Sequence, residues 1–265
     1  MTRQERDAPP ARWACCTIRF AISSLEPILK SISLAIALSL SSLGAQAQTL
    51  PLACGSLAMQ WGPFDYRPDH YIPENTYRSH EALLRVVEIE HFTPEVEAGL
   101  RGKLVRHPGK DLSYTLGIFP NHHRALISLS NLAIRLKTPQ PIETKFSVDC
   151  YFQRGIAFRP DDLLVRLIYA HHMVQTGRAA EAEAQIDFAA AQKGASPFTL
   201  RNIASLYLDA GKPEKALIHA QLAQEAGLNI DALKERMQKL GAWREPAAVP
   251  SAPDMAAAPA SAASH

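Results

Sequence analysis

A self-similarity with a period of 34 residues limits the folds open to this chain more than any other feature of its sequence. When residues 166–189 are set on residues 200–223, glycine meets glycine and alanine meets alanine. The matched pairs are Ala170 with Ala204, Gly177 with Gly211, Ala182 with Ala216 and Ala189 with Ala223. Alanine lets two helices approach closely, and glycine permits a tight turn between them. The period therefore predicts two consecutive helical hairpins, at 163–196 and 197–230.

Both predicted hairpins begin at residues typical of helix N-termini. Asp161 and Asp162 precede the first copy, and Ser196-Pro197 opens the second as an N-cap followed by a first-turn proline. Acidic residues in such a place are explained by capping and by attraction to the positive end of the helix dipole. We therefore assign the paired aspartates to helix initiation and not to catalysis.

The second copy carries the pattern of the tetratricopeptide repeat, with a tyrosine in the first helix, a glycine turn and two alanines seven residues apart in the second helix. The matching residues are Tyr207, Gly211, Ala216 and Ala223. The chain resembles this family over 163–240, and more weakly over 121–162. The resemblance implies an all-α fold: a short α-solenoid of helical hairpins with a less regular N-terminal segment and a C-terminal cap helix.

The copies depart from the family pattern at two places. The large aromatic residue near the start of each unit is replaced by Arg166 and Leu200. The proline that closes a unit is matched by Pro160, but Gly194 and Leu228 stand at the later equivalents. The two copies are therefore divergent members of the pattern.

An earlier, degenerate unit is predicted at 123–162, bounded by prolines on both sides. It is longer than the later units, and the linker 137–141 accommodates the extra residues. We expect Asn121 to cap its first helix and a second helix to run from about 145 to 158. Together the three units occupy 123–230.

A cap helix at 231–243 is expected to close the repeats and to complete a repeat region at 121–245, since a terminal helix of a repeat array presents a polar outer face to water. The residues expected on that face are Lys234, Glu235, Arg236, Gln238 and Lys239.

The segment 48–120 shows no repeat. Thr93-Pro94 predicts the start of a helix that runs to about Gly99, and a further helix is predicted at 109–119. Three short stretches resemble a group of exported proteobacterial tetratricopeptide proteins, a resemblance that carries no biochemical activity; they are residues 62–67, 91–97 and 119–126.

The first 47 residues have the layout of a signal peptide. An apolar run at 31–43 follows Lys30, and Ala45-Gln46-Ala47 matches the small-residue cleavage signal. The apolar run is shorter than the roughly 20 residues that a membrane-spanning helix needs. We expect cleavage after Ala47 and a periplasmic or secreted protein, with retention of the segment as an anchor left open.

Two cysteines, Cys54 and Cys150, remain after the predicted cleavage. In an oxidising compartment an even pair is expected to form a disulfide. The alternative is lipid attachment at Cys54, which would make the protein a membrane- or wall-associated envelope factor. The preceding residues 50–53 depart from a lipobox, with proline in place of an aliphatic residue, so membrane attachment is the less favoured alternative.

Charge argues against a nucleic-acid partner. Once residues 1–47, with five basic and three acidic side chains, are set aside, the remaining 23 basic and 23 acidic side chains balance and are interspersed. The final segment 246–265 consists almost entirely of Ala, Pro and Ser, so we expect a disordered tail.

No motif points to catalysis, a cofactor or a metal. The histidine pairs at 122–123 and 171–172 are adjacent and so diverge on a helix, and His80-Glu81 has Leu84 where a zinc-protease helix has its second histidine. Phosphate-binding, nucleophile-elbow and dinucleotide motifs are missing from the sequence. An enzyme built on the Tyr, Trp and His side chains of 54–120 is kept as an alternative.

The resemblance also implies where a partner would bind. In this family the first helices of the units line a concave face, which here would present His171 and Gln175 from one unit and Arg201, Ser205 and Asp209 from the next. Such a groove would bind an extended peptide or a terminal carboxylate, with Arg201 as the anion partner. The sequence therefore predicts an exported scaffold for a protein or peptide partner.

Overall fold

The structure, a computed structural model, describes residues 50–67 and 80–245. Within these two ranges the chain is all-helical, with ten α-helices and no β-strand, which confirms the predicted all-α class. The predicted signal peptide at 1–47 and the predicted tail at 246–265 lie outside the described residues. None of the helices in the described ranges has the length and hydropathy needed to cross a membrane.

The N-terminal part begins with a short 3₁₀ turn, η1 (Leu52–Cys54), and continues with three helices, α2 (His80–His91), α3 (Pro94–Glu97) and α4 (Gly109–Ile118). The side chain of Thr93 accepts from the backbone N–H of Val96, so the predicted N-cap is confirmed. Helix α2 contacts α4, and both α3 and α4 contact the helix that follows α4, which begins at His123.

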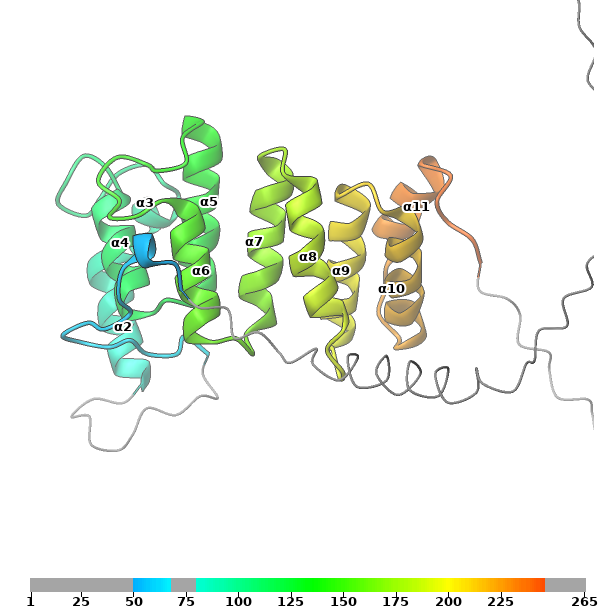
Figure 1. Ribbon diagram of the computed structural model, residues 1–265, viewed down its shortest axis with the longest axis horizontal. Helices are drawn as coiled ribbons and strands as arrows, with labels where there is room; N and C mark the ends of the chain where they lie inside the picture. Colours follow the sequence, from blue (N-terminus) through cyan, green and yellow to red (C-terminus); the bar gives the residue numbers. More distant parts are fainter. Residues whose placement is uncertain (1–49, 68–79, 246–265) are drawn as a thin grey trace, which may run out of the picture. The chain divides into compact units, whose positions relative to one another are not determined.

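Seven helices follow: α5 (His123–Leu136), α6 (Val148–Phe158), α7 (Leu163–Gln175), α8 (Ala179–Ala190), α9 (Pro197–Asp209), α10 (Pro213–Glu225) and α11 (Asp231–Lys239). Helices α5 to α10 stand side by side in chain order (Figure 1), and contacts join α7 to α8, α8 to α9 and α9 to α10. Helices α5, α7 and α9 also contact one another in sequence, so the first helix of each pair faces the first helix of the next.

The matched repeat positions explain the two regular hairpins. Gly177 and Gly211 take positive φ angles of 79° and 73° at the two turns, a backbone conformation that favours glycine. The matched alanines let the helix backbones approach, and each has none of its surface exposed: Ala170, Ala182, Ala189, Ala204, Ala216 and Ala223. The predicted start of the second hairpin is confirmed too, because Ser196 Oγ accepts from the N–H of Thr199.

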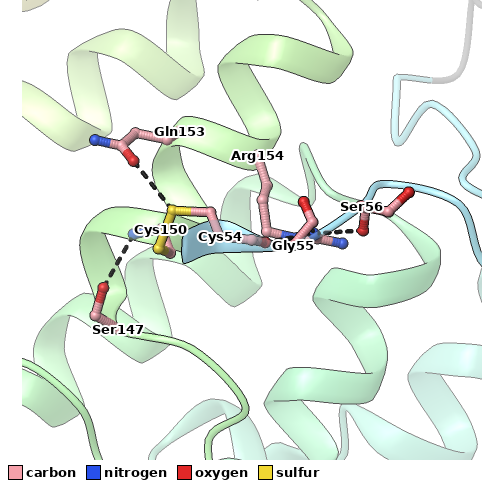
Figure 2. The surroundings of a disulfide bond; sticks show 7 residues. All are labelled: Cys54, Gly55, Ser56, Ser147, Cys150, Gln153 and Arg154. Carbon is pink, nitrogen blue, oxygen red and sulfur yellow. Dashed lines mark hydrogen bonds between the residues drawn. A yellow bond between two sulfur atoms is a disulfide. The ribbon is translucent and has the colours of Figure 1, made fainter. Parts of the chain in front are cut away.

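A disulfide joins Cys54 of η1 to Cys150 of α6, as predicted (Figure 2). Beside it, Nη1 of Arg154 donates to the backbone carbonyl oxygens of Cys54 at 2.9 Å and of Ser56 at 2.8 Å. Residues 54–67, which we call the N-terminal strap, are therefore fixed to α6 by one covalent bond and by hydrogen bonds from one buried guanidinium.

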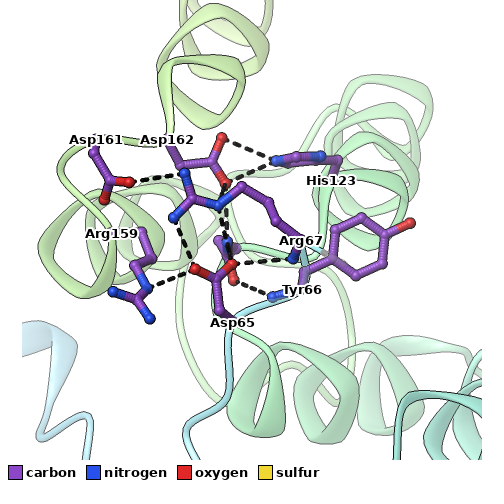
Figure 3. A network of polar contacts seen from close by, with 8 residues as sticks. Asp65, Tyr66, Arg67, His123, Arg159, Asp161 and Asp162 are labelled. Carbon is purple, nitrogen blue, oxygen red and sulfur yellow. Dashed lines mark hydrogen bonds and ion pairs between the residues drawn. The ribbon is translucent and has the colours of Figure 1, made fainter. Parts of the chain in front are cut away.

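The other end of the N-terminal strap, at Asp65 and Tyr66 (Figure 3), is held by a buried asparagine. The Nδ2 group of Asn121 donates to Asp65 Oδ1 at 2.7 Å and to Asp162 Oδ2 at 2.9 Å. Its Oδ1 accepts from the backbone N–H of Tyr66 at 2.9 Å. One amide thus joins the strap, the start of α5 and the start of α7.

The structure corrects two sequence expectations about these starts. His122, and not Asn121, caps α5, because its Nδ1 accepts from the N–H of Ala125. Asp162 stands at the N-cap position of α7 but makes no cap hydrogen bond. The side chains of Asn121 and Asp162 are instead hydrogen-bonded to each other. A contact between residues so far apart in the chain cannot be read from local sequence.

Basic side chains surround the two buried carboxylates. Arg67 pairs with Asp65 at 2.7 Å, Arg159 approaches Asp65 at 2.7 Å, and His123 Nε2 lies 2.8 Å from Asp162. Burial raises the pKa of Asp65, but hydrogen bonds from Arg67 and Asn121 outweigh it and hold the pKa well below its ordinary value. The pKa of Asp162 is also lowered: burial raises it, and the hydrogen bonds and charges of His123, Asn121 and Arg67 together outweigh burial.

Replacing Asn121 should destabilise the fold strongly. In Asn121→Ala, two buried carboxylates lose their shared donor, so we expect the free energy of unfolding to fall by about 2–4 kcal/mol. Urea denaturation followed by circular dichroism measures the loss. Asn131→Ala removes an exposed amide from α5, the helix that begins just after Asn121, and should stay within about 0.5 kcal/mol of wild type; equal effects of the two changes would contradict the bridging role of Asn121.

Reducing the disulfide should also lower stability. It closes a loop with a sequence separation of 96 residues, for which the chain-entropy model gives about 3–5 kcal/mol. Urea denaturation with and without a reductant measures the difference. The variant with both Cys54→Ser and Cys150→Ser lacks this bond, so its stability should be insensitive to the reductant; a reductant effect of equal size there would contradict the assignment of the loss to this disulfide.

Candidate functional site

A groove of about 400 Å³ runs across the first helices of the three hairpins, α5, α7 and α9. Its apolar surface comes from Ile127, Leu164, Leu167, Ile168 and Leu206. Its polar surface comes from Ser130, Asn131, His171, Asn202, Ser205 and Asp209. We call this concavity the first-helix groove.

The apolar residues of the first-helix groove divide into a floor and an edge. Leu167, Ile168 and Leu206 are buried in the core, whereas Ile127 and Leu164 leave 44% and 40% of their surfaces exposed. Exposed aliphatic side chains beside a concave polar surface offer apolar contact to a ligand. The groove therefore combines apolar anchoring surface with hydrogen-bonding groups.

Three of the five predicted groove residues lie in the first-helix groove: His171, Ser205 and Asp209. They come together because residues three or four apart on a helix share a face, and because α7 and α9 pack side by side. Arg201 is not among the residues that line the groove; its guanidinium lies 5.3 Å from the centre of the Phe198 ring.

Gln175 lines a neighbouring pocket of about 560 Å³. This pocket also contains an ion pair that the sequence reasoning missed, in which Arg178 donates to both carboxylate oxygens of Asp149 at 2.8 Å. The hydrogen bond with Asp149 raises the pKa of Arg178. Burial lowers the pKa of His172, whose Nδ1 lies 2.8 Å from Ser130 Oγ at the boundary between pocket and groove.

The carboxylate of Asp209 is engaged within the chain. It forms an ion pair with Arg236 of α11, a residue that the sequence analysis placed on the water-facing side of the cap helix. Arg236 does remain partly exposed, but its charge offsets that of Asp209 at the end of the groove. The groove therefore carries little net charge, which the sequence pattern alone did not indicate.

A third concavity, of about 290 Å³, lies in the N-terminal part, and we call it the N-terminal pocket. It is lined by Ser56, Ala58, Met59, His91, Lys110, Asp111, Ser113, Tyr114, Gly117, Lys145, Phe146, Tyr151 and Arg154. Most of these residues are far apart in the sequence, and the N-terminal strap, α4 and α6 bring them together. No local motif marked this pocket.

The N-terminal pocket contains a His–Asp pair and a serine, the residue types of a hydrolase site. His91 Nδ1 lies 2.9 Å from Asp111 Oδ1. The hydroxyl of Ser113, however, donates to the carbonyl of Gly109 and accepts from the hydroxyl of Tyr151. The serine is not bonded to a histidine, so the contact that activates a nucleophile is not formed in this arrangement.

In the part of the chain that the structure describes, no group of three or more His, Cys, Asp and Glu side chains is arranged to hold a metal ion. Comparisons of the chain with models of protein families, with curated proteins and with solved structures find no match. What these concavities can bind is therefore argued from their own shape and side chains.

Proposed function

We propose that this chain is an exported scaffold of tetratricopeptide type, which binds an extended peptide segment of a partner protein in the cell envelope. The observation that carries this proposal is the first-helix groove, a concave surface built from the first helices of three successive hairpins. Solenoids of stacked helical hairpins use such surfaces to bind partners.

The repeat interpretation is supported by the agreement between period and structure. The 34-residue period relates α7–α8 to α9–α10, with glycine turns at positive φ and buried alanines at the matched positions. Helix α5 and helix α6 supply the degenerate unit, and the segment 137–147 that joins them is longer than the predicted linker 137–141. The three pairs together make the continuous face on which the groove lies.

The chemistry of the groove fits a peptide backbone. Asn131 and Asn202 each offer a carboxamide with both donor and acceptor groups, so each can bond to peptide N–H and C=O. His171 and Ser205 add further hydrogen-bonding groups, while Leu164 offers an apolar contact for a peptide side chain. An uncharged or weakly charged segment fits this surface best.

Export is supported by the disulfide together with the signal-peptide pattern, because disulfides persist in oxidising compartments. The same bond weighs against the lipoprotein alternative. A lipid would be attached through the sulfur of Cys54, and that sulfur is bonded to Cys150. We therefore favour an envelope scaffold that is not anchored through Cys54.

Peptide binding should depend on Leu164. Peptides selected from a displayed library on the purified protein are expected to bind Leu164→Asp at least about tenfold more weakly, because a buried apolar contact becomes charged. An aspartate in the first turn suits a helix N-terminus, so α7 should stay intact. Fluorescence anisotropy measures the dissociation constants.

Ile218→Asp is the matched control, since it places the same charge on an exposed residue of α10 outside the groove. Equal losses in the two variants would remove the first-helix groove from the proposal. Arg201→Glu tests the expected anion partner. If Arg201 pairs with the terminal carboxylate of a peptide, this change weakens binding of the peptide with a free C-terminal carboxylate and leaves binding of the same peptide with a C-terminal amide unchanged.

The mass of the protein purified from the envelope fraction tests the export part of the proposal. Under non-reducing conditions we expect the mass of residues 48–265 less two hydrogens, which would report cleavage after Ala47 and one disulfide together. A mass increased by acyl chains would favour the lipoprotein alternative, and the mass of the uncleaved chain would favour retention of the signal segment as an anchor.

A further inference from the structure

The N-terminal pocket gathers positive charge from three parts of the fold. Lys110 belongs to α4, Lys145 to the segment before α6, and Arg154 to α6 itself. All three line the same cavity of about 290 Å³. This accumulation is local, since the charges of the chain from residue 48 onward balance.

Arg154 is the most informative of the three because it is buried. Only 2% of its surface is exposed. Its Nη1 donates to backbone carbonyls of the N-terminal strap, and its Nε has no hydrogen-bond partner. Among the residues that the structure describes, no carboxylate pairs with this guanidinium, although buried charges are ordinarily paired.

The two lysines are also without an acidic partner in the described ranges. Both are exposed, and neither has a carboxylate oxygen within the 4.0 Å of an ion pair. Lys145 Nζ lies 5.2 Å from the centre of the Phe146 ring, and the Arg154 guanidinium carbon lies 4.9 Å from the centre of the same ring. Two cations therefore converge on one aromatic wall of the pocket.

The single carboxylate in the pocket does not neutralise these cations. Asp111 Oδ1 lies 2.9 Å from His91 Nδ1, and its Oδ2 accepts from the backbone N–H of Lys103 at 2.9 Å. Both oxygens are thus engaged with groups other than the three cations. The pocket keeps a positive balance that an anion from outside would satisfy.

We propose that the N-terminal pocket is a binding site for a small organic anion that carries a carboxylate or phosphate group. Lys110, Lys145 and Arg154 supply the positive charge, and charge-assisted hydrogen bonds of this kind are among the stronger ones in proteins. Met59 and Phe146 form apolar walls for the body of the ligand. The volume lies near the lower limit of small-molecule sites, which fits a compact metabolite.

Titration of the ¹⁵N-labelled protein with succinate, at constant pH and ionic strength, tests this site by NMR. We expect saturable shifts of the Arg154 Nε–Hε signal and of the backbone signals of Ser56 and Lys145. Succinamide has nearly the same shape without the charge, and it should shift these signals at least about tenfold less effectively. A parallel titration with inorganic phosphate separates the two ligand classes: the tighter probe identifies the group that the site takes.

A double variant, Lys110→Ala with Lys145→Ala, removes two exposed cations while leaving the buried Arg154 in place. We expect it to bind the tighter probe at least about tenfold more weakly. Lys193→Ala with Lys239→Ala removes the same charge from exposed positions outside the pocket and should bind as wild type does. Equal weakening in both double variants, or the absence of saturable shifts with both anions, would overturn the proposal.

Discussion

Two buried carboxylates, Asp65 and Asp162, set the condition on which the rest of this structure depends. Neither can stay ionised away from water without donors and cations around it. The amide of Asn121 bridges them, and arginine side chains from the strap and from the turn before α7 complete the shell. Meeting that requirement fixes where α5 and α7 begin relative to each other, and hence the spacing of the helices that form the first-helix groove.

The N-terminal strap is held at both ends, and this makes it part of the architecture. At one end the disulfide and Arg154 tie Cys54 to α6; at the other end Asp65 and Tyr66 are bonded to Asn121. The residues between these ends include Met59, which forms a wall of the N-terminal pocket. The pocket exists because a segment without regular structure is held against two helices.

The sequence predicted the parts of this fold that depend on local pattern. The period predicted the helix pairs at 163–230. Thr93 and Ser196 cap their helices as expected, because each side chain accepts from the backbone N–H only three residues further along the chain. Asn121 was misjudged because its partners are 56 and 41 residues away. In the groove, helical spacing was enough to place Ser205 and Asp209 on one face, but it could not foresee the ion pair between Asp209 and Arg236. The sequence analysis kept the Tyr and His side chains of 54–120 as an alternative site, and His91 and Tyr114 do line the N-terminal pocket, but no motif links its three cations.

The two candidate sites differ in what would drive binding. In the first-helix groove, Asp209 is paired with Arg236, and Arg178 in the adjoining pocket is paired with Asp149. The charges of these side chains are therefore balanced within the chain. Contact there must come from apolar area and from neutral hydrogen bonds, which salt screens little. In the N-terminal pocket the charge is unbalanced, so attraction of an anion from solution should weaken as ionic strength rises. A partner peptide and a small anion could therefore bind to one chain at separate surfaces, through interactions that respond differently to the surrounding medium.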